Sequence, residues 1–226
     1  SRGLGDVYKR QNVICSDKTG TLTQNRMTVT ELCSPSGPAA FSSAEGQTML
    51  SFAALCNNST LSGGLDRPSA AGEPTEVALV LAAANSGKRK NLLELSFPRV
   101  REIPFDSGRK LMTTVHSLGG GRYRIITKGA PDVLLRRCEA YAVGLGASPL
   151  TAAKRAQIEG YNEDMAGRAL RVLGVAYRDV ERLPKNADEI ETRLVFCGLL
   201  GMIDPPRPQA KACLLYTSDA ADDSLR

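Results

Sequence analysis

Long hydrophobic runs, histidines and paired cysteines are nearly absent from this chain of 226 residues. No apolar run approaches the roughly 18 residues that a membrane-spanning helix requires, so we expect the part of the protein represented here to be soluble. The chain has one histidine, His116, and its six cysteines include no CxxC pair, which argues against a zinc site and against Cys/His catalysis. The scattered thiols fit a reducing compartment.

Long runs of one charge and glycine-rich phosphate loops are missing as well. The net charge is +5, and the densest basic run is the KRK of residues 88–90, which is typical of a solvated helix end or loop. We therefore expect no nucleic-acid partner. Neither GxxxxGK[ST] nor GxGxxG occurs, which argues against P-loop hydrolases and protein kinases. The KTG triplet of residues 18–20 has no SxxK before it, which argues against a β-lactamase site.

A carboxylate stands where a buried strand is expected to end. The stretch NVICS at residues 12–16 predicts a short strand, and Asp17, Lys18 and Thr19 follow it. Burying a carboxylate is costly unless it is paired or used in chemistry, and α/β folds bind ligands at the carboxyl ends of strands. Asp17 could attack phosphorus while Lys18 neutralises phosphoryl charge. A capped turn with a surface ion pair is the non-catalytic interpretation of the same residues.

The rest of the pattern predicts helices around an antiparallel sheet. The expected helices cover residues 46–56, 75–87, 131–138 and 151–169, the expected strands cover 99–105, 110–118, 122–128, 171–177 and 193–204, and 62–74 is expected to be a loop. A GGG turn at residues 119–121 indicates a hairpin. Strands from both ends of the chain bracket this arrangement, which suggests a domain inserted into a split host domain.

The segment SDKTGTLT at residues 16–23 resembles the phosphorylation motif of P-type cation-transporting ATPases. The segments ALCNNS, GEPTEVAL, IPFDSGRKLM, TKGAPD, LRVLGVAYRD and GMIDPPRP follow in the order found in the nucleotide-binding and phosphorylation domains of these pumps. The resemblance implies that Asp17 is phosphorylated, with Lys18 and Thr19 in the catalytic site. It also implies that Asp17 and Thr19 bind Mg²⁺.

The same resemblance assigns a nucleotide pocket and a hinge. It implies that Phe105 stacks on adenine, that Glu76 lies at the adenine end, and that Lys128 and Gly129 form the base of the pocket. It places Lys110 near the phosphates and Arg171 on the phosphate oxygens of ATP. Asp204 and Arg207 resemble the hinge that returns to the phosphorylation domain.

Most of these residues also have a structural interpretation. Phe105 could be an ordinary core residue, and Glu76 could be a first-turn helix carboxylate favoured by the macrodipole. Lys110 and Arg171 could be solvent-facing strand residues. His116 alternates with apolar residues on a strand and receives no role, and the cysteines are expected to be buried small hydrophobes.

The resemblance implies an α/β plus α+β fold. In this interpretation a partial haloacid-dehalogenase-like (Rossmannoid) phosphorylation domain, residues 12–30 and 194–212, is interrupted by a nucleotide-binding domain at residues 31–193. That inserted domain is expected to contain an antiparallel sheet flanked by helices. Residues 1–11 and 213–226 resemble translated sequencing adaptors, and we expect neither segment to belong to the fold.

The expected function is that of the catalytic portion of an ATP-driven pump on the cytoplasmic side of the cell membrane. ATP and Mg²⁺ are the implied cofactors, and a cation that crosses the membrane part of a full-length protein is the implied cargo. The wording of IPFDSGRKLMTTVH and GMIDPPRP resembles bacterial calcium-type pumps, so Ca²⁺ is the expected ion. The TGD and GDGxND loops of the family are missing, so we expect a monomeric, inactive fragment that binds nucleotide weakly.

Two other classes remain open at this point. A soluble aspartate-dependent phosphohydrolase would share the split host fold, and a nucleotide-binding module without catalysis would share the pocket.

Overall fold

The computed structural model describes residues 23–24, 26–64, 68–144, 146–184, 186–205 and 207. Contacts divide the chain into two units, of which one is Met27–Ile203 and the other combines Ser1–Arg26 with Asp204–Arg226. The expected strand at 12–16, the residues Asp17, Lys18 and Thr19, and the adaptor-like ends lie outside the described residues. The described secondary structure lies almost entirely in the unit Met27–Ile203.

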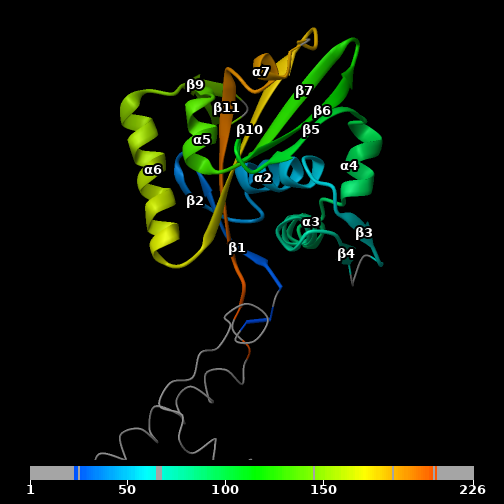
Figure 1. Cartoon of the computed structure of the whole chain (residues 1–226), viewed down its shortest axis with the longest axis vertical. Coiled ribbons are helices and arrows are strands. Elements are labelled where there is room, and N and C mark those ends of the chain that lie inside the picture. The colour runs from blue at the N-terminus through cyan, green and yellow to red at the C-terminus, as the bar shows by residue number, and fades with distance from the viewer. Residues whose placement is uncertain are drawn as a thin grey trace, which may run out of the picture. The chain divides into compact units, whose positions relative to one another are not determined.

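This unit is built on one large sheet (Figure 1), whose main path runs β2-β1-β11-β10-β7-β6-β5. Its strands are β1 (Thr28–Ser34), β2 (Gly37–Ala39), β5 (Arg99–Asp106), β6 (Leu111–Gly119), β7 (Arg122–Gly129), β8 (Cys138–Val143), β9 (Gly146–Pro149), β10 (Arg171–Val180) and β11 (Leu194–Ile203). All pairings are antiparallel except that β8 runs parallel to β11, with β9 beside β8. The expected antiparallel sheet is confirmed.

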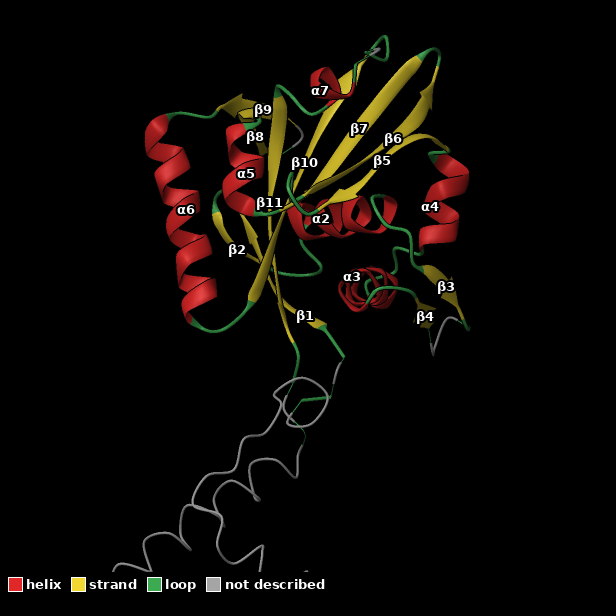
Figure 2. Cartoon of the chain, viewed as in Figure 1, coloured by secondary structure: helices red, strands yellow, loops and turns green. Residues whose placement is uncertain are grey.

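Helices cover both faces of this sheet (Figure 2). On one side lie α2 (Ala44–Leu55), α3 (Pro74–Asn85) and α4 (Lys90–Ser96), and on the other lie α5 (Pro131–Arg136) and α6 (Ala152–Gly167). Successive side chains along a strand point to opposite faces of the sheet, so each face has its own hydrophobic core. Met112 and Ile126 pack with α2 and α3, whereas their neighbours Leu111 and Ile125 pack with α5 and α6. The arrangement is a three-layer α/β/α sandwich, completed by the short α7 (Ala187–Ile190).

The predicted helices begin where capping groups satisfy the first backbone N–H groups. The Ser43 side chain accepts from the amide of Gly46 at the start of α2, and the Thr151 side chain accepts from that of Lys154 at the start of α6. Glu73 caps α3, and Pro74 occupies the first turn, where a missing N–H costs nothing. These caps explain why the helices expected over 46–56, 75–87 and 151–169 are confirmed to within a few residues.

Several short elements were not expected. The loop predicted over 62–74 contributes to a small hairpin, β3 (Thr60–Ser62) with β4 (Ser69–Ala71). The β8–β9 hairpin and α4 were also missed. Each is too short to show a hydrophobic period, so its conformation depends on what it packs against.

The two contact units divide at 26/27 and 203/204. Residues 194–203 fall in the sheet unit because β11 lies between β1 and β10 and shares the core of the sheet. The domain bounds expected at 30/31 and 193/194 stay a prediction. Within the part of the chain that the structure describes, no helix combines the length and apolar character needed to cross a membrane.

Candidate functional site

A cavity of about 660 Å³ opens in unit Met27–Ile203 and is lined by the six residues assigned to a nucleotide pocket. They come from five places: α3, β5, the turn before β6, β7 and β10. The six are Glu76, Phe105, Lys110, Lys128, Gly129 and Arg171, and the remaining lining residues are Asn58, Glu73, Thr75, Met112, Ala130, Pro131, Val172 and Leu173. The fold thus brings together residues that are up to 95 positions apart, from 76 to 171.

Glu76 and Lys128 form an ion pair inside this cavity. Lys128 Nζ lies 2.6 Å from Glu76 Oε1, and the two side chains are only 8% and 15% exposed. The other carboxylate oxygen, Glu76 Oε2, accepts a hydrogen bond from the backbone N–H of Asn58 at 3.0 Å. Such a pair is costly to break, because either partner alone would be a poorly solvated charge. Lys128 is therefore neutralised by Glu76.

Phe105 is not a core residue. Its side chain, on β5, is 62% exposed, whereas large aromatic side chains in a fold of this size are usually well covered. The core-packing interpretation of Phe105 is therefore wrong. An exposed ring at the wall of a cavity is available for stacking on a flat ligand.

Lys110 occupies a strained position next to Gly129. Its φ of 55° is in the left-handed region, which non-glycine residues seldom adopt. Its N–H donates to Asp106 O at 2.6 Å, and its carbonyl accepts from Ala130 N–H at 3.1 Å. A Cβ on Gly129 would lie 2.2 Å from Lys110 O, so only glycine fits there. The close approach of β7 thus holds the Lys110 turn against the cavity.

Arg171 is held by two residues that sequence reasoning did not single out. Its Nη1 donates to Thr75 Oγ1 at 2.8 Å, and that hydroxyl donates to Glu73 Oε1 at 3.0 Å. Both belong to the GEPTEVAL segment, but only Glu76 was assigned a role there. The signal that could have found them is their position around the start of α3, on the same turn as Glu76. The cavity is consequently lined by three cationic and two acidic side chains.

A second, smaller cavity of about 270 Å³ lies beside α2 and includes His116 and Arg124. The His116 ring is buried, with Nδ1 2.9 Å from Phe97 O and Nε2 2.9 Å from Thr114 Oγ1. Burial lowers the pKa of His116 below its ordinary value of 6.5. The ring is therefore neutral and structural, which agrees with its having no assigned role.

The described cysteines are buried free thiols, as expected. Burial raises the pKa of Cys33 to about 11 and that of Cys138 to about 12, and it also raises the pKa of Cys56 and Cys197. None of these four is a reactive thiolate at neutral pH.

The two residues assigned to a hinge, Asp204 and Arg207, form hydrogen bonds between the segment that precedes Met27 in the chain and the segment that follows Ile203. Asp204 Oδ2 accepts from Thr23 Oγ1 at 2.6 Å, and Asp204 Oδ1 accepts from the backbone N–H of Arg26 at 3.1 Å. Arg207 Nε donates to Thr23 O at 3.1 Å. These bonds hold the two segments in register; whether they act as a hinge stays a prediction.

No cluster of His, Cys, Asp or Glu that could hold a metal ion occurs among the described residues. The expected Mg²⁺ ligands, Asp17 and Thr19, fall outside them. The donor set itself, a carboxylate with a hydroxyl or carbonyl oxygen, is of the kind that Mg²⁺ prefers.

Comparison with known proteins finds the same family throughout. Residues 45–209 match the family model described as P-type ATPase, cytoplasmic domain N. The chain is 36% identical to a calcium-transporting ATPase of Bacillus subtilis over 92% of its own length and 26% of the relative's. It is 38% identical to the cation-transporting ATPase pma1 of Synechocystis, covering 92% of the chain and 26% of that protein. It is 32% identical to the human sodium/potassium-transporting ATPase subunit alpha-3, covering 87% and 22%. The chain thus spans about a quarter of the length of these relatives.

Proposed function

The chain belongs to the P-type ATPase family, and on that premise we propose that its larger cavity binds ATP for an ATP-driven cation pump. The observation that carries the proposal is the convergence of Glu76, Phe105, Lys110, Lys128, Gly129 and Arg171 on one cavity of about 660 Å³. That volume is within the range of small-molecule sites, and the cavity combines an apolar wall with a few polar groups.

Each part of the cavity suits one part of ATP. The exposed Phe105 ring can stack on the base, and Met112 and Leu173 supply apolar surface beside it. Arg171 and Lys110 offer cationic donors for the phosphates, and the Lys110 ammonium makes no ion pair with any described residue. The carboxylate of Glu76 would repel phosphate and can accept from an amino group of the base. The base therefore lies toward Glu76, and the phosphates lie toward Arg171.

The chemistry in this proposal takes place at Asp17. A carboxylate oxygen of Asp17 attacks the γ-phosphorus of ATP, the bond from that phosphorus to the β–γ bridging oxygen breaks, and ADP leaves with the electron pair. Lys18 offsets phosphoryl charge, and the Thr19 oxygens complete the contacts. Asp17 and Thr19 would hold Mg²⁺, which neutralises the charge between an anionic nucleophile and an anionic substrate.

We propose Ca²⁺ as the transported ion and the cytoplasmic side of a membrane as the location. Support comes from relatives whose names include calcium transport and from the family model, which describes a cytoplasmic domain. In this proposal the inserted domain delivers ATP to a haloacid-dehalogenase-like phosphorylation domain, and phosphorylation drives transport through membrane helices of a full-length protein.

The test is phosphoryl transfer in a full-length protein that contains this chain. Incubation with ATP labelled at the γ-phosphate should label the protein at Asp17, and Asp17→Asn should abolish the label while leaving ATP binding intact. Asp164→Asn, at an aspartate of α6 whose side chain is 70% exposed, is a matched control that should keep the label. Labelling that persists in Asp17→Asn would overturn the assignment of the nucleophile.

A further inference from the structure

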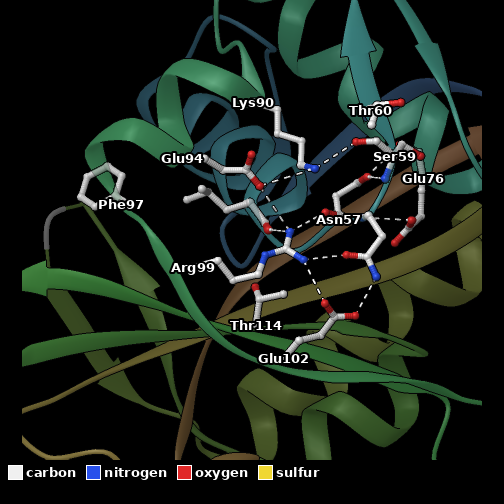
Figure 3. A network of polar contacts seen from close by, with 12 residues as sticks. Asn57, Ser59, Thr60, Glu76, Lys90, Glu94, Phe97, Arg99, Glu102 and Thr114 are labelled. Atoms are coloured by element: carbon white, nitrogen blue, oxygen red, sulfur yellow. Dashed lines mark hydrogen bonds and ion pairs between the residues drawn. The ribbon is translucent and has the colours of Figure 1, made fainter.

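Asn58, at the wall of the larger cavity, forms a ring of hydrogen bonds with the side chains of Arg99 and Glu102, both of which are labelled in Figure 3. Arg99 Nη1 donates to Asn58 Oδ1 at 2.6 Å, and Asn58 Nδ2 donates to Glu102 Oε1 at 2.6 Å. The ring is closed by Arg99 Nη1 and Glu102 Oε2, which lie 3.1 Å apart. We call this group the Asn58 clamp. The Oδ1 and Nδ2 atoms of Asn58 each have a partner, so the orientation of its amide is fixed.

The backbone carbonyl groups of the loop that follows α2 are also bound by side chains. Arg99 Nη2 donates to the carbonyl oxygens of Leu55 and Asn57, at 3.0 and 2.5 Å. Lys90 Nζ donates to Ser59 O at 2.9 Å. Arg99 is 21% exposed, so these bonds are shielded from competing water. The segment after α2 is thus held both by its side chains and by its carbonyl groups.

What this loop presents to the cavity is the backbone N–H of Asn58, which donates to Glu76 Oε2. Without it, the Glu76 carboxylate could rotate to share both oxygens with Lys128, whose Nζ now binds Oε1 alone. An ionised carboxylate has about four lone-pair sites, and two of them are used here. The clamp therefore sets the direction in which the remaining acceptor sites of Glu76 point.

We propose that the Asn58 clamp is a specificity device, which positions Glu76 to accept a hydrogen bond from the amino group of a purine base. This inference rests on the proposed nucleotide function of the cavity. A base that carries an amino group at this position gains a bond to a charged acceptor, and a base without it leaves that acceptor unpaired. Arg99 and Glu102 line no part of the cavity. Their effect on selectivity is therefore indirect and passes through the loop of Asn57 and Asn58, to which they bond.

The experiment compares ATP with purine riboside triphosphate, which is ATP without the 6-amino group. Amide NMR spectra of the 226-residue chain report binding of each nucleotide and folding in one titration. The unsubstituted chain should prefer ATP by about tenfold, the usual worth of a hydrogen bond to a charged group. Arg99→Met and Glu102→Met should lower the affinity for ATP and leave that for the deaminated analogue nearly unchanged, so the preference falls to about twofold or less.

The matched control is Arg124→Met, which removes a bidentate arginine–aspartate pair, with Asp179, in the same sheet but away from the larger cavity. It should keep the full preference for ATP. If Arg99→Met gives a collapsed amide spectrum, Glu102→Met decides the question, since Glu102 is a partly exposed residue at 28%.

The outcomes separate this inference from the proposed function. A preference for ATP that survives in both clamp variants would overturn the specificity role and leave nucleotide binding standing. Equal affinity of the unsubstituted chain for both nucleotides would do the same. Absence of saturable binding of either nucleotide to the unsubstituted chain would overturn the proposed function itself.

Discussion

The two cavities of the sheet unit differ in how their polar groups are used. In the smaller one, Arg124 is bound to Asp179 and lies 5.3 Å from the Phe52 ring, and both nitrogens of His116 have partners. In the larger one, Phe105 is exposed and the Lys110 ammonium has no ion-pair partner among the described residues. Arg124 and His116 thus have their partners within the fold, while the larger cavity leaves an exposed aromatic face for a ligand. The comparison teaches that the two cavities differ in how exposed their aromatic side chains are, as well as in volume, since Phe105 is 62% exposed and Phe52 is 6% exposed.

The largest expected effect is a loss of stability when a side chain is added at Gly129, which lines the larger cavity. Gly129→Ala places a Cβ 2.2 Å from Lys110 O, so the β7 strand and the Lys110 turn must separate. We expect a loss of about 3 kcal/mol in the free energy of unfolding, measured by urea denaturation followed by circular dichroism. Gly160→Ala is the control, because a Cβ there meets nothing within 4 Å and the helix gains about 0.5–1 kcal/mol. Equal stability of the two variants would show that the close contact at Gly129 is relieved.

A smaller effect is expected at Phe105, where a substitution should change the affinity for ATP but not the stability of the fold. Phe105→Ala should raise the dissociation constant for ATP about tenfold, because a stacked base contributes about 1–3 kcal/mol. The free energy of unfolding should hardly change, since the ring is 62% exposed.

The counterpart of Phe105 in the smaller cavity is Phe52, which is 6% exposed. Phe52→Leu should lower the stability by about 1 kcal/mol and leave the ATP dissociation constant unchanged. Calorimetric titration with ATP checks the affinities, and an unchanged dissociation constant in Phe105→Ala would show that the base does not stack there.

The smallest effect concerns pH and the smaller cavity. Since burial lowers the pKa of His116 below 6.5, the folded state binds its proton less readily than the unfolded chain. The stabilisation from neutral His116 is fully present above pH 6.5 and is lost as the pH falls below that value toward the folded pKa. His116→Gln should therefore flatten the pH dependence of the unfolding free energy between pH 7 and pH 5. Identical slopes in the two proteins would contradict a lowered pKa.

The sequence was sufficient for the long elements and for six of the residues that line the larger cavity. Pro74 at the start of α3 and the glycines between β6 and β7 act within a few residues, so their effects are visible in the chain itself. The six cavity residues were found through resemblance, and the structure places all of them in one cavity. Their roles in nucleotide binding stay predictions.

What the sequence could not supply is pairing between distant segments. Arg99 meets Asn58 across 41 positions, and no local pattern distinguishes it from any other arginine in a strand. The register of β11 between β1 and β10 is likewise set by tertiary packing, so the sequence does not show which strands β11 pairs with. The β3–β4 hairpin has three residues in each strand, too few for an alternating pattern to be recognised.

The pairing of β1 with β11 has a mechanical consequence. Thr28 lies opposite Ile203, so the chain enters and leaves the sheet through neighbouring antiparallel strands. A force that pulled the two connecting segments apart would load this ladder at one end and open its hydrogen bonds one after another, as in unzipping. A force that drew both segments in the same direction would instead be carried in shear by the β1–β2 and β10–β11 ladders, many bonds at a time. The β1–β11 pair should therefore resist a force that pulls both segments in the same direction better than a force that pulls them apart.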